Sequence, residues 1–391
     1  MLRFELPEET LEASHPARVL WRVLETLDLG GFERGVRSVA GRAGRPTHSP
    51  RMLLCLWLYG ISRGIGSARE IARRVKDERA FQWIAGDVPV SHDVLRDFRV
   101  AHAEALNELM TNVLGALVQK KLVTLERVAV DGTRVRASAS APSFRREASL
   151  LACREQARLH LEAVLATARE SGRERAAAVA AAKSFEARVE AAIATVAELR
   201  EAGREAPRAS TTDPEARVMK MPDGGFRPAY NIQLAVEGSE LGGARTIVGV
   251  RVTQQGNDYD GLDALTDDVH ARTGLSPTVV LADGGFASHR GIEALATRGV
   301  RPVVSVPAHE KKPRVREPSE AVAAWRADME TTSARTELRA RASLVELTNA
   351  HLKTRFGLRH LLVRGVAKVT SVVLLTALAS NLLTHAAHLL A

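Results

Sequence analysis

The segment 278–282 is a short, continuous apolar run in a chain that otherwise has mostly helical periodicity. It is too short for a helix, and its composition favours a strand buried on both faces in the middle of a sheet. Alternating apolar residues between 226 and 255 predict two more strands, paired as antiparallel neighbours. A further apolar run at 303–306 predicts another strand. The chain must therefore build a sheet among many helices.

Residues 125–139 also leave the helical period. Val128 and Val130 favour a strand, and Val135 favours a second one. Asp131-Gly132, which lies between them, is a common turn signal. We therefore expect a strand, a turn at Asp-Gly and a returning strand.

The chain after this strand is dominated by alanine, arginine and glutamate as far as about residue 204. A break at Ser171-Gly172 divides it, and a narrow apolar stripe runs along its second half. This pattern predicts an antiparallel helical hairpin inserted between strands. The stripe consists of Phe185, Val189, Ile193 and Val196.

The N-terminal region is helical by periodicity, with a fully apolar helix near 52–59 and an amphipathic one at 67–76. A break follows at 86–89, after which Ser91 is suited to cap the next helix. Small helices with arginines on one face are compatible with a helix-turn-helix-like DNA reader, or with a plain bundle that has a solvated basic face. On the first interpretation, the DNA-contacting residues are Arg69, Arg73, Arg74, Arg96 and Arg99.

The order of the predicted elements is strand, insertion, two strands, helix, strand, helix, strand and helix. This is the order of a ribonuclease-H-like mixed sheet. We therefore predict an α+β (mixed) fold with an all-helical N-terminal domain over 1–122 and a ribonuclease-H-like domain over 123–391. The helical insertion occupies 143–210.

Two aspartates are placed at the ends of the predicted strands, and one glutamate is on a predicted helix. These are Asp131, Asp283 and Glu346. Carboxylates on rigid supports can bind a pair of Mg²⁺ ions, which activate the nucleophile and hold the leaving oxygen in phosphodiester chemistry. The glycine after each aspartate lets a DNA backbone approach closely.

Each carboxylate also has an ordinary explanation. Asp-Gly-Gly-Phe occurs twice, at 223–226 and at 283–286. The first copy lies in the context of a hairpin turn, whereas the second follows a buried strand, so only Asp283 is expected at a sheet edge.

Glu346 on its own is compatible with a solvated residue on a surface helix. Asn349 and Lys353 follow at helical spacing and are expected on the same face, which suits a metal ligand beside a phosphate-binding lysine. Other acidic residues are weaker candidates, because they lack an apolar anchor or lie in a sequence typical of a turn. They are Glu330, Glu337, Asp258 and Asp260.

Lysine and arginine total 55 against 46 acidic residues, which gives a net charge of +9 and favours a polyanionic partner. A GC-rich genome would also enrich arginine. A basic loop at 309–319 adds expected DNA contacts at Lys311, Lys312 and Arg314. The two cysteines have neither metal-ligand spacing nor a disulfide pattern, which fits a reducing cytoplasm. The polar residues in the apolar run 369–391 favour a core helix, so no membrane association is expected.

Several segments in this order resemble a DDE transposase of a bacterial insertion sequence over nearly the whole chain. The similar segments are 44–59, 91–99, 130–133, 212–217, 229–233, 282–286, 346–353, 356–359, 364–365 and 381–382. The family signature usually has a tyrosine and an arginine at fixed intervals before the glutamate. Those intervals lead here to Arg339 and Ala342, with Arg341 next to the expected position.

The resemblance implies that Asp131, Asp283 and Glu346 are ligands of two Mg²⁺ (or Mn²⁺) ions, with Lys353 near the transferred strand. It implies double-stranded DNA as partner, both the terminal inverted repeats of the element and its target, and a place at the bacterial nucleoid in the cytoplasm. A homodimer in the DNA complex is compatible with this. Two alternatives stay open: a related nuclease that cuts without joining, and a DNA-binding relative whose catalytic site has decayed.

Overall fold

The computed structural model describes residues 10–34, 47–166, 173–238, 243–308 and 319–391. Helices form the N-terminal part of the described chain, and they surround α3, which is buried over nearly its whole length because it is apolar all round. Their bounds are α1 Pro16–Thr26, α2 Gly30–Glu33, α3 Pro50–Ser62, α4 Ala68–Asp77, α5 Arg79–Ala85, α6 His92–Ala101 and α7 Ala103–Gln119.

A mixed sheet follows, with β1 at its centre. One side of β1 pairs antiparallel with β5, which in turn pairs with β4 and β6, and the other side runs parallel to β7 and then β8. The predicted α+β fold and ribonuclease-H-like order are therefore confirmed. The strands are β1 Arg127–Arg136, β4 Arg217–Lys220, β5 Phe226–Gly238, β6 Arg245–Thr253, β7 Val279–Ala282 and β8 Arg301–Val304.

The prediction of a turn at Asp131-Gly132 is wrong, because β1 runs straight through both residues. Its antiparallel register with β5 is continuous from Val128 to Arg136, so the backbone groups of the dipeptide are paired within the sheet. Glycine is needed here for a different reason. A Cβ atom at Gly132 would lie 2.0 Å from Oδ1 of Asp258, whose carboxylate packs against this strand.

The two copies of Asp-Gly-Gly-Phe differ as predicted. Asp223 lies in the tight connection between β4 and β5, where Gly224 has a φ of +83°. Asp283 directly follows β7 and accepts a hydrogen bond from the Gly285 amide at 2.9 Å, which starts the short helix η3 (Gly284–Phe286).

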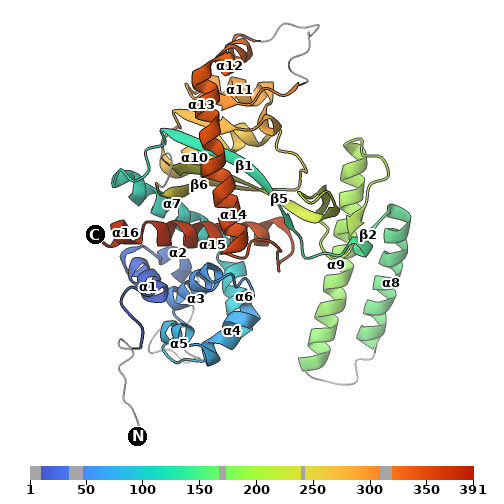
Figure 1. The fold of residues 1–391 in the computed structure, drawn as a ribbon. Helices are drawn as coiled ribbons and strands as arrows, with labels where there is room; N and C mark the ends of the chain where they lie inside the picture. Colours follow the sequence, from blue (N-terminus) through green and yellow to red (C-terminus); the bar gives the residue numbers. More distant parts are fainter. Residues whose placement is uncertain (1–9, 35–46, 167–172, 239–242, 309–318) are drawn as a thin grey trace.

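Helices α8 (Glu147–Ala166) and α9 (Arg173–Glu201) pack against each other and project from the side of the molecule (Figure 1). At their base, after the short helix η2 (Ala141–Ser143), β2 (Phe144–Arg145) pairs with β3 (Ala209–Ser210). The predicted helical hairpin after the first strand is therefore present.

The remaining helices cover the sheet and connect it to the N-terminal region. Helix α15 is long and apolar enough to cross a membrane, but 61% of its apolar window is buried. It packs on β6, α3 and α7, between the N-terminal helices and the sheet (Figure 1), as a core helix does. The bounds are α10 Gly261–Thr273, α11 His289–Thr297, α12 Glu320–Glu330, α13 Thr332–Arg341, the π-helical turn η5 Ala342–Glu346, α14 Leu347–Thr354, α15 Val366–Thr384 and α16 Ala386–Leu390.

Candidate active site and DNA-contacting surface

Asp131 lies on the central strand, and its side chain is only 18% exposed. Its Oδ2 accepts a hydrogen bond from Asn349 Nδ2 at 2.8 Å, and its Oδ1 lies 3.4 Å from Arg341 Nη1. Burial raises the pKa of Asp131. The charges of Asp283 and Asp258 raise this pKa further, while Arg341 and Asn349 lower it. The carboxylate is therefore held in a site where its negative charge is only partly compensated.

Asp283 is positioned by β7, the parallel neighbour of β1. Since both strands carry their aspartates beyond the last parallel pair, the two carboxylates share one edge of the sheet. The structure thus brings Asp283 close enough to influence the charge of Asp131.

Glu346 reaches the same region from the C-terminal helices. Its side chain is 54% exposed, and its Oε1 accepts a hydrogen bond from Arg341 Nη2 at 2.9 Å. Asn349, one turn later, is buried and contacts Asp131. Arg341 and Asn349 therefore connect the helical glutamate to the strand aspartate.

Lys353 lies near the same carboxylate. Burial lowers its pKa, and the charges of Arg134 and Arg359 lower it further, whereas the negative charge of Asp131 opposes that effect. A lysine in this setting is suited to contact a phosphate oxygen without first leaving an ion pair with a described residue.

The helix predicted around Glu346 contains a π turn over Ala342–Glu346, in which the Leu347 amide donates to the carbonyl of Ala342. A π turn holds one more residue than an α turn. Arg341, five positions before Glu346, therefore lies on the same face as Glu346. In a regular α-helix, the residue four positions earlier would occupy this place. The intervals of the family signature lead to Ala342, whereas the arginine that contacts Glu346 is its neighbour Arg341.

Within the described ranges, no group of three histidine, cysteine, aspartate or glutamate side chains is gathered closely enough to hold a metal ion. Arg341 stands between two of the predicted ligands instead. The donor chemistry still fits a hard divalent cation, because the predicted ligands are all carboxylates.

Asp258 is a further acidic residue beside this site. Its Oδ1 accepts hydrogen bonds from Asn231 Nδ2 at 2.7 Å and Gln233 Nε2 at 2.8 Å. Both amides are buried on β5 and were not assigned a role from the sequence. The available signal was two alternating amide residues within an otherwise apolar strand. The weaker candidate Glu337 instead pairs with Arg301 at 2.7 Å.

The arginines predicted to contact DNA are not equivalent. Arg73, Arg74 and Arg96 form ion pairs with acidic residues of their own helices, and Arg74 also pairs with Glu78 just beyond α4. Arg99 is buried over the ring of Trp57 at 4.5 Å, and burial lowers its pKa to about 10, which argues against a DNA contact. Lys311, Lys312 and Arg314 lie outside the described residues.

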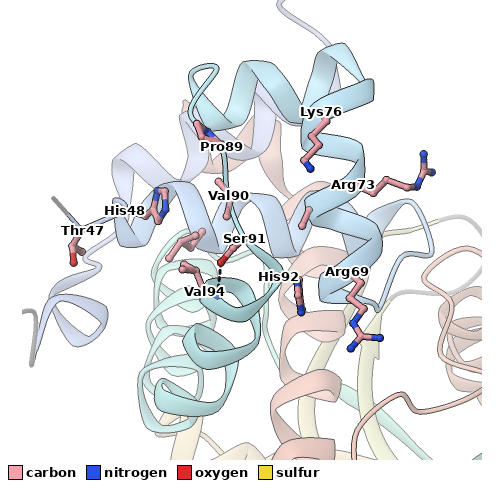
Figure 2. Close-up of a pocket in the computed structure, with 12 residues that line it drawn as sticks. Thr47, His48, Arg69, Arg73, Lys76, Pro89, Val90, Ser91, His92 and Val94 are labelled. Carbon is pink, nitrogen blue, oxygen red and sulfur yellow. Dashed lines mark hydrogen bonds between the residues drawn. The ribbon is translucent and has the colours of Figure 1, made fainter. Parts of the chain in front are cut away.

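A groove of about 750 Å³ lies between α4 and the start of α6 (Figure 2). Arg69 and Lys76 line it, are exposed, and form no ion pair with any residue in the described part of the chain. Lys76 points into the groove, whereas Arg73 points away from it (Figure 2). His48 and His92 lie on the other sides. Lys76 was not among the predicted contacts.

A helical region that carries a basic groove, joined to a ribonuclease-H-like sheet with carboxylates at one edge, is the architecture of an enzyme acting on nucleic acid. Residues 194–382 match the family described as transposase DDE domain, and residues 7–101 match the transposase domain DUF772. The chain belongs to the DDE transposases of insertion sequences. The DDE match includes Asp283, Glu346 and Lys353 but begins after Asp131. No curated protein and no solved structure matches the chain.

Proposed function

We propose that this transposase binds the ends of its own element, hydrolyses phosphodiester bonds there and joins the 3′-hydroxyls to target DNA. Asp131, Asp283 and Glu346 are the proposed metal ligands. The observation that carries the proposal is the connected network in which Arg341 and Asn349 bring the helical glutamate to the strand aspartate, beside Asp283.

Two Mg²⁺ ions, or Mn²⁺ in their place, would supply an activated oxygen nucleophile and compensate charge on the phosphate. The residues of the chain would hold the metal ions and the phosphate in position. Asp131 and Asp283 are fixed by adjacent strands, and Asn349 orients Asp131 through its 2.8 Å hydrogen bond. Lys353 is the proposed contact to the transferred strand.

The groove of Figure 2 is the proposed contact to the DNA backbone, through Arg69 and Lys76. Arginines that already form ion pairs are weaker candidates for a phosphate contact. They would have to leave their carboxylate partners, and a partner that stayed in place would repel the phosphate. Element ends and target DNA are both proposed substrates, a homodimer is the proposed form of the DNA complex, and the bacterial cytoplasm at the nucleoid is the proposed place of action.

A strand-transfer assay with Mg²⁺ and element-end DNA tests the proposal. Asp131→Asn, Asp283→Asn and Glu346→Gln should each lose at least about a hundredfold in rate, because each removes a ligand on which metal placement depends. Asp223→Asn is the matched control, since this aspartate is the first residue of the same tetrapeptide, Asp-Gly-Gly-Phe, but lies in a turn. Full activity of Asp131→Asn or Asp283→Asn would refute the three-carboxylate site.

The same assay separates the two alternatives. Cleavage without joining would identify a nuclease, and DNA binding without metal-dependent cleavage would identify a catalytically decayed relative. The altered residues before Glu346 would favour a catalytically decayed relative only if the segment that contains Glu346 were a regular α-helix throughout. The π turn at Ala342–Glu346 restores an arginine to the glutamate and so supports an active enzyme.

A further inference from the structure

Arg341 contacts two of the three carboxylates assigned to the metal. Its Nη1 is 3.4 Å from Asp131 Oδ1, and its Nη2 donates to Glu346 Oε1 at 2.9 Å. The arginine side chain is 13% exposed, whereas that of Glu346 is 54% exposed. The guanidinium therefore lies on the inner side of the pair, between two side chains that would have to share a cation.

The π turn is what makes this double contact available. In an α-helix, residues five positions apart point in directions that differ by about 140°. Across the π turn, the additional residue brings Arg341 and Glu346 to one face, where the structure places them in contact. π turns are rare overall, but those that occur are frequently found at functional sites. The position of this turn therefore favours a functional role for the ion pair over a purely structural one.

A guanidinium has only donors, and it engages carboxylate lone pairs that a metal ion would also need. The positive charges of an arginine and a divalent cation also repel each other at short distance. Metal and guanidinium therefore compete for the same oxygens of Asp131 and Glu346. In the absence of metal, Arg341 offsets the repulsion between these carboxylates.

We propose that Arg341 is an internal counter-ion, which holds Asp131 and Glu346 in the metal-free transposase and is displaced when the divalent cation binds. This inference rests on the proposed metal site. It makes Arg341 a positioning residue that sets the metal affinity and keeps the carboxylates ordered before the cation arrives.

Calorimetric titration of the full chain with Mn²⁺, without DNA, tests the competition. Arg341→Gln should bind Mn²⁺ more tightly than the wild type by on the order of tenfold, equivalent to about 1.4 kcal/mol. Arg341→Lys should fall between them, because a single ammonium does not bridge both carboxylates, and it also serves if the glutamine variant fails to fold. Equal or weaker Mn²⁺ binding by the folded variants would overturn the proposal.

Arg335→Gln is the matched control, because this arginine lies on the same helix but donates to the carbonyl of Met329. Its Mn²⁺ affinity should equal that of the wild type. Asp131→Asn separates the two levels of the argument. If this variant binds Mn²⁺ as well as the wild type does, the proposed metal site itself fails. If it loses binding while Arg341→Gln is unchanged, only the counter-ion role fails.

Discussion

At the residue scale, Asp131 and Glu346 differ in how strongly the fold restrains them. Asp131 is buried on a central strand and is held by Asn349 and Arg341, so its charge is costly without a cation. Glu346 is more than half exposed, and within the described residues its carboxylate contacts only Arg341. The strand thus fixes one proposed metal ligand, Asp131, and a side-chain ion pair holds the other, Glu346, beside it.

The buried charge of Asp131 should be visible in the stability of the metal-free protein. Because burial raises the folded-state pKa of Asp131 above the ordinary value of 3.8, the folded state binds this proton more tightly than the unfolded state. The stability linked to the proton is complete below the unfolded pKa and is lost as pH rises through the folded pKa. Asp131→Asn should therefore be more stable than the wild type at pH 7 in EDTA, and the difference should shrink toward pH 3.8. Thermal unfolding against pH measures this.

Asp223 serves as a control, because its pKa is shifted in the opposite direction to that of Asp131. The hydrogen bond from Arg227 lowers the pKa of Asp223, so the ionised form contributes stability that is present above the unfolded pKa. Asp223→Asn should not stabilise the protein at pH 7. A wild type more stable than Asp131→Asn at that pH would contradict the electrostatic account of the site.

At the element scale, the decisive feature is the π turn between α13 and α14. It rotates α13 relative to α14 by one residue, which turns an apparent mismatch in the family signature into a contact. An inserted residue of this kind leaves no periodicity signal in a segment that is already helical, because the flanking apolar residues still repeat within a turn.

Changing the length of this turn should test its role. Deleting Ala342 removes the additional residue, so Arg341 and Glu346 become four positions apart on a regular α-helix and remain in contact. Strand-transfer activity should stay within about tenfold of the wild type. Inserting an alanine after Ala342 rotates the arginine by about 100° and should reduce activity by about a hundredfold or more. Circular dichroism confirms folding, and the reverse ranking of the two variants would rule out this account.

At the scale of the whole molecule, the helical region and the sheet share one continuous apolar core. Helix α15 joins them, and Asn381 on this helix bonds both the amide and the carbonyl of Ile247 on β6. Gly64 and Gly357 also bring the two regions together, since a Cβ at Gly357 would lie 2.6 Å from the Gly64 carbonyl oxygen. DNA held in the groove of Figure 2 would therefore have a fixed relation to the candidate active site.

Salt dependence should identify the groove as the DNA contact. The double variant Arg69→Ala, Lys76→Ala should lower the slope of log K against log salt concentration by about 2, because two phosphate contacts and their counterion release are lost. Fluorescence anisotropy with element-end DNA measures the slope. Replacing Lys120 and Lys121 with alanine removes the same charge from the end of α7 and should leave the slope nearly unchanged. Equal slopes for both double variants would refute the assignment.

The sequence by itself determined the order of strands and helices along the chain, the helical insertion and the position of Asp283 at a strand end, since each depends on local periodicity. It also placed Asn349 on the helical face that meets Asp131. Only the tertiary structure decided that β1 continues through Asp131-Gly132, because pairing with β5 outweighs a local turn preference. Only the tertiary structure showed that Arg99 is buried and that Arg341 bridges two carboxylates. Both depend on packing between residues far apart in the chain, which no local pattern encodes.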